Sequence, residues 1–207
     1  MKKIIIDLDN TIYPVSSIGE KLFKPLFTLL SEKKYGLTAQ IIEKSKEQIM
    51  RVPFQKVAAQ FKFPDDLTHN ALSLLRCLRY DDEMNYFLEY EELRRLKTDK
   101  FLLTTGFKNL QESKIRSLKI ESDFKEIFIV DPDKSFLTKK DVMLQIMDKY
   151  QLKKEELIVI GDDPESEIKA ANELDIVNYL VDADRKYLNC PSTHSGINLR
   201  EVIKYLD

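Results

Sequence analysis

The 207-residue sequence predicts an α/β fold with a parallel sheet and a helical insert after the first strand. Residues 2–8 form a short apolar run with three consecutive isoleucines, which is typical of a buried strand in a parallel sheet. Residues 18–97 repeat apolar positions at three- and four-residue steps, as helices do. After residue 97, short apolar runs alternate with helical patterns, which indicates βαβ crossovers and a sheet covered on both faces.

Helix-start signals divide the insert. Thr38 is an expected N-cap, Pro53 precedes one helical stretch, and Pro64 precedes another. Strands are expected over 101–104, 127–130, 157–160 and 176–181, and helices over 110–118, 139–150, 165–174 and 199–206. We therefore expect a Rossmann-like core over 1–15 and 98–207 and an all-helical cap over 16–97. Four aromatic residues near the end of the insert have helical spacing and are expected to pack inside the cap: Tyr80, Tyr86, Phe87 and Tyr90.

Composition excludes several classes of protein. Hydrophobic residues make up 43% of the chain and charged residues 33%, which suits a folded domain with a charged surface rather than a disordered or fibrous chain. Lysine plus arginine (33) nearly balances aspartate plus glutamate (35), so no basic field favours a nucleic-acid polymer.

No segment of the sequence resembles a membrane anchor or an export signal. The N-terminal apolar run is interrupted at Asp7 and Asp9, and residues 22–30 are shorter than the about 20 residues that span a bilayer. The two cysteines, Cys77 and Cys190, match no zinc or redox spacing. We expect a cytoplasmic protein with no membrane partner, and nothing in the sequence specifies an oligomeric state.

Polar residues follow three of the expected strands. In open α/β sheets, ligands bind beyond the carboxyl ends of the strands. Asp7 and Asp9 leave the first strand on the same side because side chains alternate along a strand. The strand over 101–104 runs into Thr104-Thr105-Gly106, where a hydroxyl and turn amides suit a phosphate oxygen, and the strand over 157–160 leads to Asp162.

Several carboxylates at one sheet edge repel one another unless a cation neutralises them. Asp7, Asp9 and Asp162 supply the oxygen ligands that Mg²⁺ prefers, together with substrate phosphate and water. Lys139 or Lys140, just before the next helix, can add a positive charge.

Taken in order, four segments resemble the motifs of the haloacid dehalogenase-like (HAD) hydrolase superfamily: Asp7-Leu8-Asp9-Asn10-Thr11, Thr104, Lys139 and Gly161-Asp162-Asp163. The resemblance covers residues 1–15 and about 98–182. Each motif alone is weak, whereas four in this order at strand ends are specific. The insert is similar to the C1-type cap that this family places between its first two motifs.

The resemblance implies a mechanism. Asp7 would attack phosphorus to form an aspartyl-phosphate, and Asp9 would be the general acid and then the general base. Lys139 would offset the charge of the phosphate and of Asp7. Thr104, with Thr105 and Gly106 nearby, would bind phosphoryl oxygens. Mg²⁺ would be held by the carboxylates of Asp7 and Asp162 and the backbone carbonyl of Asp9.

The sequence departs from the family pattern in two motifs. The lysine motif is Thr138-Lys139-Lys140-Asp141 rather than Lys-Pro, and we prefer Lys139 to Lys140 by its distance from the next strand, with Lys134 as a third candidate. Glu167 stands where an aspartate is common, and it would reach Mg²⁺ through water or orient Lys139. Asp163 is expected to be an N-cap, with a supporting role at the metal as the alternative.

The expected function is hydrolysis of a small phosphorylated metabolite. The presence of Asp9 favours phosphoryl transfer over dehalogenation, because dehalogenases of this family lack that aspartate. Residues 9–14 resemble the pyrimidine 5'-nucleotidase-like branch, which raises nucleoside monophosphates among the substrates. The alternatives are a phosphomutase and a non-catalytic module that binds Mg²⁺ and phosphate for regulation.

Overall fold

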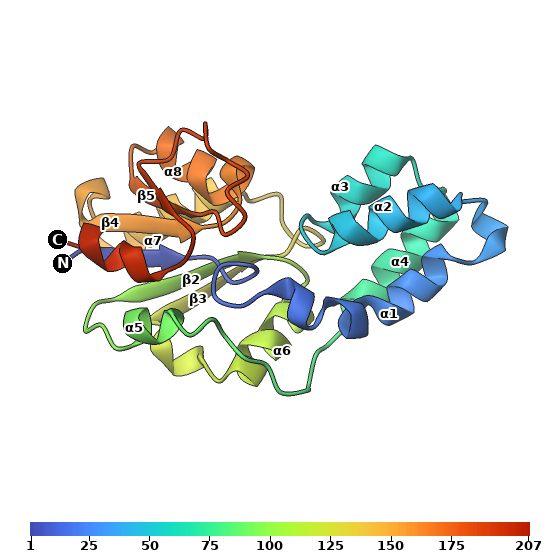
Figure 1. The fold of residues 1–207 in the computed structure, drawn as a ribbon, viewed down its shortest axis with the longest axis horizontal. Helices are drawn as coiled ribbons and strands as arrows, with labels where there is room; N and C mark the ends of the chain where they lie inside the picture. The colour runs from blue at the N-terminus through green and yellow to red at the C-terminus, as the bar shows by residue number, and fades with distance from the viewer.

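Six parallel strands form one sheet at the centre of the protein (Figure 1), as a computed structural model of residues 1–207 shows. The strand order is β3-β2-β1-β4-β5-β6, so the first strand lies inside the sheet. The strands are β1 (Lys3–Ile6), β2 (Lys100–Thr105), β3 (Glu126–Val130), β4 (Leu157–Gly161), β5 (Val177–Val181) and β6 (His194–Gly196). The α/β fold class predicted from the sequence is confirmed. The pattern missed β6, because this strand has three residues, none of them strongly apolar, and it forms by pairing with β5.

Alternating side chains of the strands build a core on each face of the sheet. Ile4 and Ile6 belong to the larger cluster, whereas Ile5 points to the opposite face and joins the smaller one. Helices α5 (Tyr90–Arg94) and α6 (Lys108–Leu118) and the 3₁₀ turn Arg200–Tyr205 cover the first face. The second face is covered by α7 (Lys139–Tyr150) and α8 (Lys169–Glu173).

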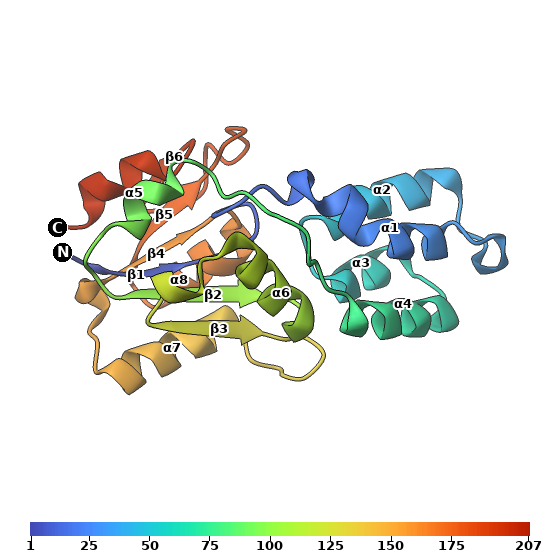
Figure 2. The same cartoon turned by 90° about the horizontal axis from the view of Figure 1, so that it is seen from below.

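Four helices form a lobe beside one end of the sheet, opposite the two chain termini (Figures 1 and 2). They are α1 (Gly19–Leu30), α2 (Ala39–Ile49), α3 (Phe54–Phe61) and α4 (Asp65–Cys77). Thr38 caps α2 by accepting a hydrogen bond from the backbone of Ile41, and prolines precede α3 and α4. The apolar sides of these helices continue the larger core cluster, so the lobe packs as an extension of the sheet domain.

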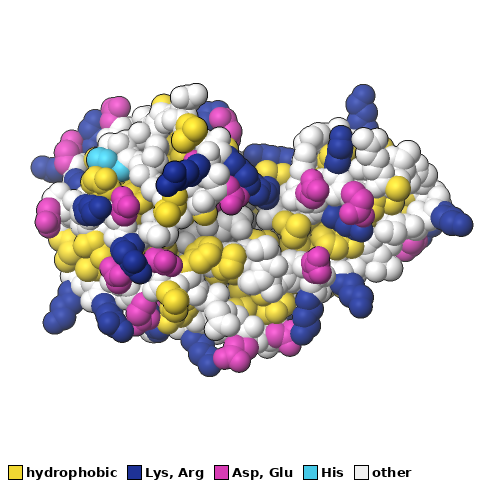
Figure 3. Space-filling view, in the orientation of Figure 1, with side chains coloured by type: hydrophobic (Ala, Val, Ile, Leu, Met, Phe, Trp, Pro, Cys, Tyr) yellow, Lys and Arg dark blue, Asp and Glu magenta, His cyan; other side chains and the backbone are white.

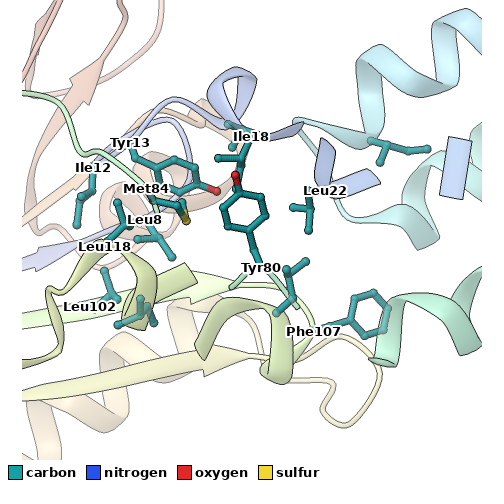
Figure 4. Packing of buried hydrophobic residues seen from close by; sticks show 14 of the residues in the cluster. Leu8, Ile12, Tyr13, Ile18, Leu22, Tyr80, Met84, Leu102, Phe107 and Leu118 are labelled. Atoms are coloured by element: carbon teal, nitrogen blue, oxygen red, sulfur yellow. The ribbon is translucent and has the colours of Figure 1, made fainter. Parts of the chain in front are cut away.

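Residues 78–89 return from the lobe to the sheet without forming a helix, although the sequence pattern predicted helical structure there. Hydrogen bonds to the sheet domain replace helical ones: Tyr80 N–H donates to Ser113 Oγ (2.9 Å), and Phe87 N–H donates to the carbonyl of Ile12 (2.8 Å). Tyr80 and Met84 pack beside Leu8, Ile12 and Tyr13 (Figure 4).

The aromatic residues at the end of the insert are therefore not packed inside the cap, contrary to the expectation. Tyr90 donates a hydrogen bond to Asp123 (3.1 Å), and Arg94 pairs with the same carboxylate (2.9 Å). Tyr86 packs edge to face on Tyr90. The residues fit helical spacing, but the partner of Tyr90 and Arg94 lies just before β3, and the backbone of Tyr80 is bonded to α6.

Among the helices of the structure, none combines the length and the hydrophobicity needed to cross a membrane.

Candidate active site

The carboxyl ends of three strands line one cavity between the sheet and the helical lobe. In the register of the sheet, Ile6 lies opposite both Leu102 and Ile160, so the residues that follow these strands meet at one edge. The cavity has a volume of about 730 Å³. It is lined by every residue that the sequence analysis placed in the site, namely Asp7, Asp9, Thr104, Thr105, Gly106, Lys139 and Asp162. Figure 3 shows the hollow between the two parts of the molecule, with Lys and Arg side chains at its edge.

Asp7 lies at the floor of the cavity and pairs with a buried lysine. Lys139, at the first turn of α7, donates a hydrogen bond to Asp7 Oδ1 (2.5 Å) and also pairs with Glu167. All three side chains are less than a tenth exposed. Burial raises the pKa of Asp7 well above its ordinary value, although Lys139 opposes this shift. The pKa of Lys139 is raised despite its burial, because Asp7 and Glu167 stabilise the ammonium.

Lys140 takes no part in this arrangement. Its side chain points to the surface of α7 and pairs with Glu173 (2.9 Å). The capping box at Thr138 and Asp141 fixes where α7 begins and therefore which lysine faces the sheet. Of the two lysines that the sequence offered, Lys139 is the one that reaches Asp7.

Glu167 and Asp163 lie on the segment that follows β4. Glu167 contacts Lys139 and accepts a hydrogen bond from the backbone of Asp163 (3.3 Å), which places it to orient the lysine. Gly161 allows this contact, because a Cβ at that position would lie 2.8 Å from Glu167 Cγ. Asp163 accepts a hydrogen bond from the backbone of Glu165 (2.9 Å) and caps a π-helical turn over Pro164–Ile168.

Asp9 is held by three side chains that the sequence analysis did not assign to the site. Lys114 donates to Asp9 Oδ1 (2.7 Å), Gln111 donates to Asp9 Oδ2 (2.7 Å), and the Tyr13 hydroxyl also donates to Oδ1. Burial alone would raise the pKa of Asp9, but the charge of Lys114 and the three donors together hold this pKa below its ordinary value.

Gln111 also joins Asp9 to the predicted phosphate-binding residue. Its amide donates to Thr104 Oγ1 (2.6 Å), so the Thr104 hydroxyl has already accepted a bond and its own proton is left to donate. Thr104 is buried, and Thr105 is partly exposed on the same cavity wall. A Cβ at Gly106 would lie 3.0 Å from Gln111, so a larger residue there would crowd the amide.

Gln111 and Lys114 had a signal in the sequence. Together with Ile115 and Leu118 they form an i, i+3, i+4, i+7 stripe on the helix, and this stripe faces the core. Polar residues on a helix face that the pattern places in the core need hydrogen-bonding or charged partners. Their presence on such a face therefore points to a functional site. The partners themselves lie about a hundred residues away in the sequence.

The donor chemistry of the cavity fits a hard divalent cation. Burial and the nearby Glu167 raise the pKa of Asp162 to about 7, so a positive ion beside it would stabilise the carboxylate. No three acidic, histidine or cysteine side chains are clustered closely enough to enclose a metal by themselves. A cation such as Mg²⁺ does not require such a cluster, because it takes one or two carboxylates and completes its shell with water and phosphate.

Comparison with known proteins identifies the family. A family model for haloacid dehalogenase-like hydrolases matches residues 1–175. The sequence has no significant match among curated proteins.

Several solved structures have the same fold. A protein from Clostridium difficile named as a phosphatase is 18% identical, with a TM-score of 0.73, 100% of this chain covered and 98% of that one. A haloacid dehalogenase-like hydrolase from Streptococcus pneumoniae, SP0104, is 21% identical, with a TM-score of 0.72 and coverage of 100% and 99%. The HAD-hydrolase YfnB from Bacillus subtilis, solved with bound magnesium, is 19% identical, with a TM-score of 0.69 and coverage of 100% and 98%. With the family match over most of its length and the four motifs gathered in one cavity, the chain belongs to the haloacid dehalogenase-like hydrolases.

Proposed function

We propose that the protein is a Mg²⁺-dependent phosphomonoester hydrolase that acts through an aspartyl-phosphate on a small phosphorylated metabolite. The observation that carries this proposal is the buried Asp7, paired with Lys139 at the end of β1, with the second acid Asp9 and the hydroxyl of Thr104 lining the same cavity.

In this proposal a carboxylate oxygen of Asp7 attacks phosphorus while the bond to the leaving oxygen breaks. The negative charge of the bound substrate would raise the pKa of Asp9, so that Asp9 can carry a proton and give it to that oxygen, and the alcohol leaves. Asp9 then takes a proton from water, whose oxygen attacks the phosphoryl group, so phosphate is released and Asp7 is restored. Lys139 and Thr104 stabilise the charge that develops on the phosphoryl oxygens.

Asp7, Asp162 and the backbone carbonyl of Asp9 would hold Mg²⁺. The ion would offset the negative charge of the carboxylates and the phosphate. The carboxylate of Asp9 is already bonded to Gln111 and Lys114, which agrees with a metal contact through its backbone instead.

We assign the cap to the insert over 16–97, with α1–α4 as the part that covers the cavity. All four helices of this lobe carry residues that line the cavity. Movement of the lobe toward the sheet would therefore exclude water during the reaction. A cytoplasmic location and nucleoside monophosphates as substrates stay predictions from the sequence.

A phosphomutase is the second candidate, because a structural neighbour from Thermotoga maritima is named as a β-phosphoglucomutase, with a TM-score of 0.62 and 15% identity. The same aspartyl-phosphate would then return its phosphoryl group to a sugar instead of to water. Analysis of the products separates the two reactions, because only hydrolysis releases inorganic phosphate.

The test measures phosphate release, with and without Mg²⁺, from nucleoside monophosphates, sugar phosphates and carboxylated phosphomonoesters. Wild type is compared with Asp7→Asn, which is expected to lose at least about a thousandfold in rate with an unchanged circular dichroism spectrum. Undiminished release by Asp7→Asn would overturn the mechanism. Binding of Mg²⁺ and phosphate without turnover on any substrate would favour a regulatory module.

A further inference from the structure

We propose that the cap wall of the cavity binds a second anionic group, carried by the leaving group of the substrate. This inference rests on the proposed phosphatase function and specifies its substrate class. The observations that carry it lie in the turn between α2 and α3 and the first turn of α3.

The cap wall holds two cations without partners. Arg51 and Lys56 line the cavity with exposed side chains, and neither forms an ion pair within 4.0 Å, although the charge of Arg51 helps to lower the pKa of Asp184. The other cationic side chains that line the same cavity are all paired, namely Lys114, Lys139, Lys140 and Lys169. None of the cap residues that line the cavity is acidic, whereas the sheet side carries many carboxylates. The cap wall is therefore the part of the cavity that attracts an anion.

Gln55, between these two cations, provides an independent observation. Its Oε1 atom is the one buried side-chain oxygen or nitrogen in the whole protein that has no hydrogen-bond partner. Buried polar atoms in native proteins are almost always paired, so the unpaired Oε1 marks Gln55 as a side chain that would gain a partner by turning toward the cavity. The backbone N–H groups of Phe54 and Gln55 also donate no hydrogen bond within the protein.

The charges in the cavity decide which leaving group fits. Lys139 and the proposed metal already offset the negative charge of the transferred phosphate and of Asp7. Arg51 and Lys56 are therefore not needed to neutralise that charge. A nucleoside or simple alcohol is uncharged and would leave both cap cations without a partner. A carboxylate or a second phosphate would accept hydrogen bonds from Arg51, Lys56 and the free backbone amides. With the Gln55 side chain turned toward the cavity, a hydroxyl next to that group would donate to its Oε1.

The experiment compares matched substrates that differ in charge. Phosphoglycolate is compared with 2-hydroxyethyl phosphate, and 3-phosphoglycerate with glycerol 3-phosphate, while glycerol bisphosphate tests a second phosphate in place of the carboxylate. We expect kcat/KM to be at least about tenfold higher for the anionic member of a pair. Arg51→Gln and Lys56→Gln should each reduce this ratio severalfold. Lys44→Gln is the matched control, because Lys44 is an exposed lysine of α2 outside the cavity.

Two outcomes would overturn the inference. In the first, wild type has no preference for the anionic substrates or prefers a nucleoside monophosphate. In the second, Arg51→Gln and Lys56→Gln lower turnover equally for both members of a pair. That result would mean that these cations act on the closure of the cap, for example toward Asp163, to which Lys56 is electrostatically coupled.

A binding measurement separates this inference from the proposed function. The same pairs are titrated calorimetrically into Asp7→Asn in the presence of Mg²⁺, where no turnover is expected. Tighter binding of the anionic member, lost in the Arg51→Gln background, would support the cap site even if hydrolysis were undetectable. Equal binding of both members would refute the cap site, whatever the catalytic result for wild type.

Discussion

The two walls of the cavity differ in how completely their polar groups are paired. On the sheet side, Lys139 is bonded to Asp7 and Glu167, and Lys114 is bonded to Asp9. On the cap side, Arg51 and Lys56 have no partner. The sheet side is therefore preorganised, as a site that stabilises the charges of a reaction must be. The cap side instead presents exposed cations that are free to meet a charged group of a ligand.

The largest loss of activity is expected when Lys139, the central cation on the sheet side of the cavity, is replaced. Lys139→Met should lower kcat/KM by about a hundredfold to a thousandfold, because it removes the charge that offsets both Asp7 and the transferred phosphate. The matched variant Lys140→Met should retain most of the activity, since Lys140 pairs with Glu173 at the surface. Steady-state kinetics of both variants check this difference, and equal losses would show that Lys139 has no special role.

A second test addresses how Asp9 is held. Gln111→Leu and Lys114→Met should each lower kcat by about tenfold to a hundredfold, because Asp9 loses a donor that fixes its position. For Gln111→Leu we also expect weaker inhibition by inorganic phosphate, since Gln111 orients the Thr104 hydroxyl.

Lys108→Met, at the exposed start of α6, is the control for this helix. If Gln111→Leu lost stability but kept both its kcat and its affinity for phosphate, Gln111 would be a packing residue rather than a positioning one.

The smallest expected effect concerns the contact between the two regions. Arg76, at the end of α4, pairs with Asp133 through two hydrogen bonds of 2.7 Å, and these bonds hold the pKa of Asp133 below its ordinary value of 3.8. Asp133→Asn should lower the Tm by no more than about 3 °C at neutral pH, because the pair is partly exposed.

The sign of the pH dependence follows from the lowered pKa. The stability from this pair is complete above the unfolded pKa of Asp133 and is lost as the pH falls through the folded one. The difference in Tm between wild type and Asp133→Asn should therefore shrink below about pH 4. A difference that persists at pH 2.5, measured by calorimetry, would show that the ion pair is not its source.

The sequence predicted much of the cavity, because parallel strands bring their carboxyl ends to one edge. Asp7, Thr104 and Asp162 could be placed at that edge from the strand pattern alone. The sequence favoured Lys139 over Lys140 only by its distance from the next strand, because the capping box of α7 decides which of two adjacent residues faces the sheet. It also missed Gln111 and Lys114, whose partner Asp9 lies in a distant part of the chain.

By itself the sequence determined the class of the fold and the order of its motifs, since the period of apolar residues and the residues that cap helices act over a few positions. The tertiary structure alone decided which side chains pair, that residues 78–89 leave the helical pattern, and that the cap wall keeps Arg51 and Lys56 unpaired. The physical reason is distance along the chain. Hydrogen bonds and ion pairs depend on ångström-scale positions that only the packing of remote segments sets.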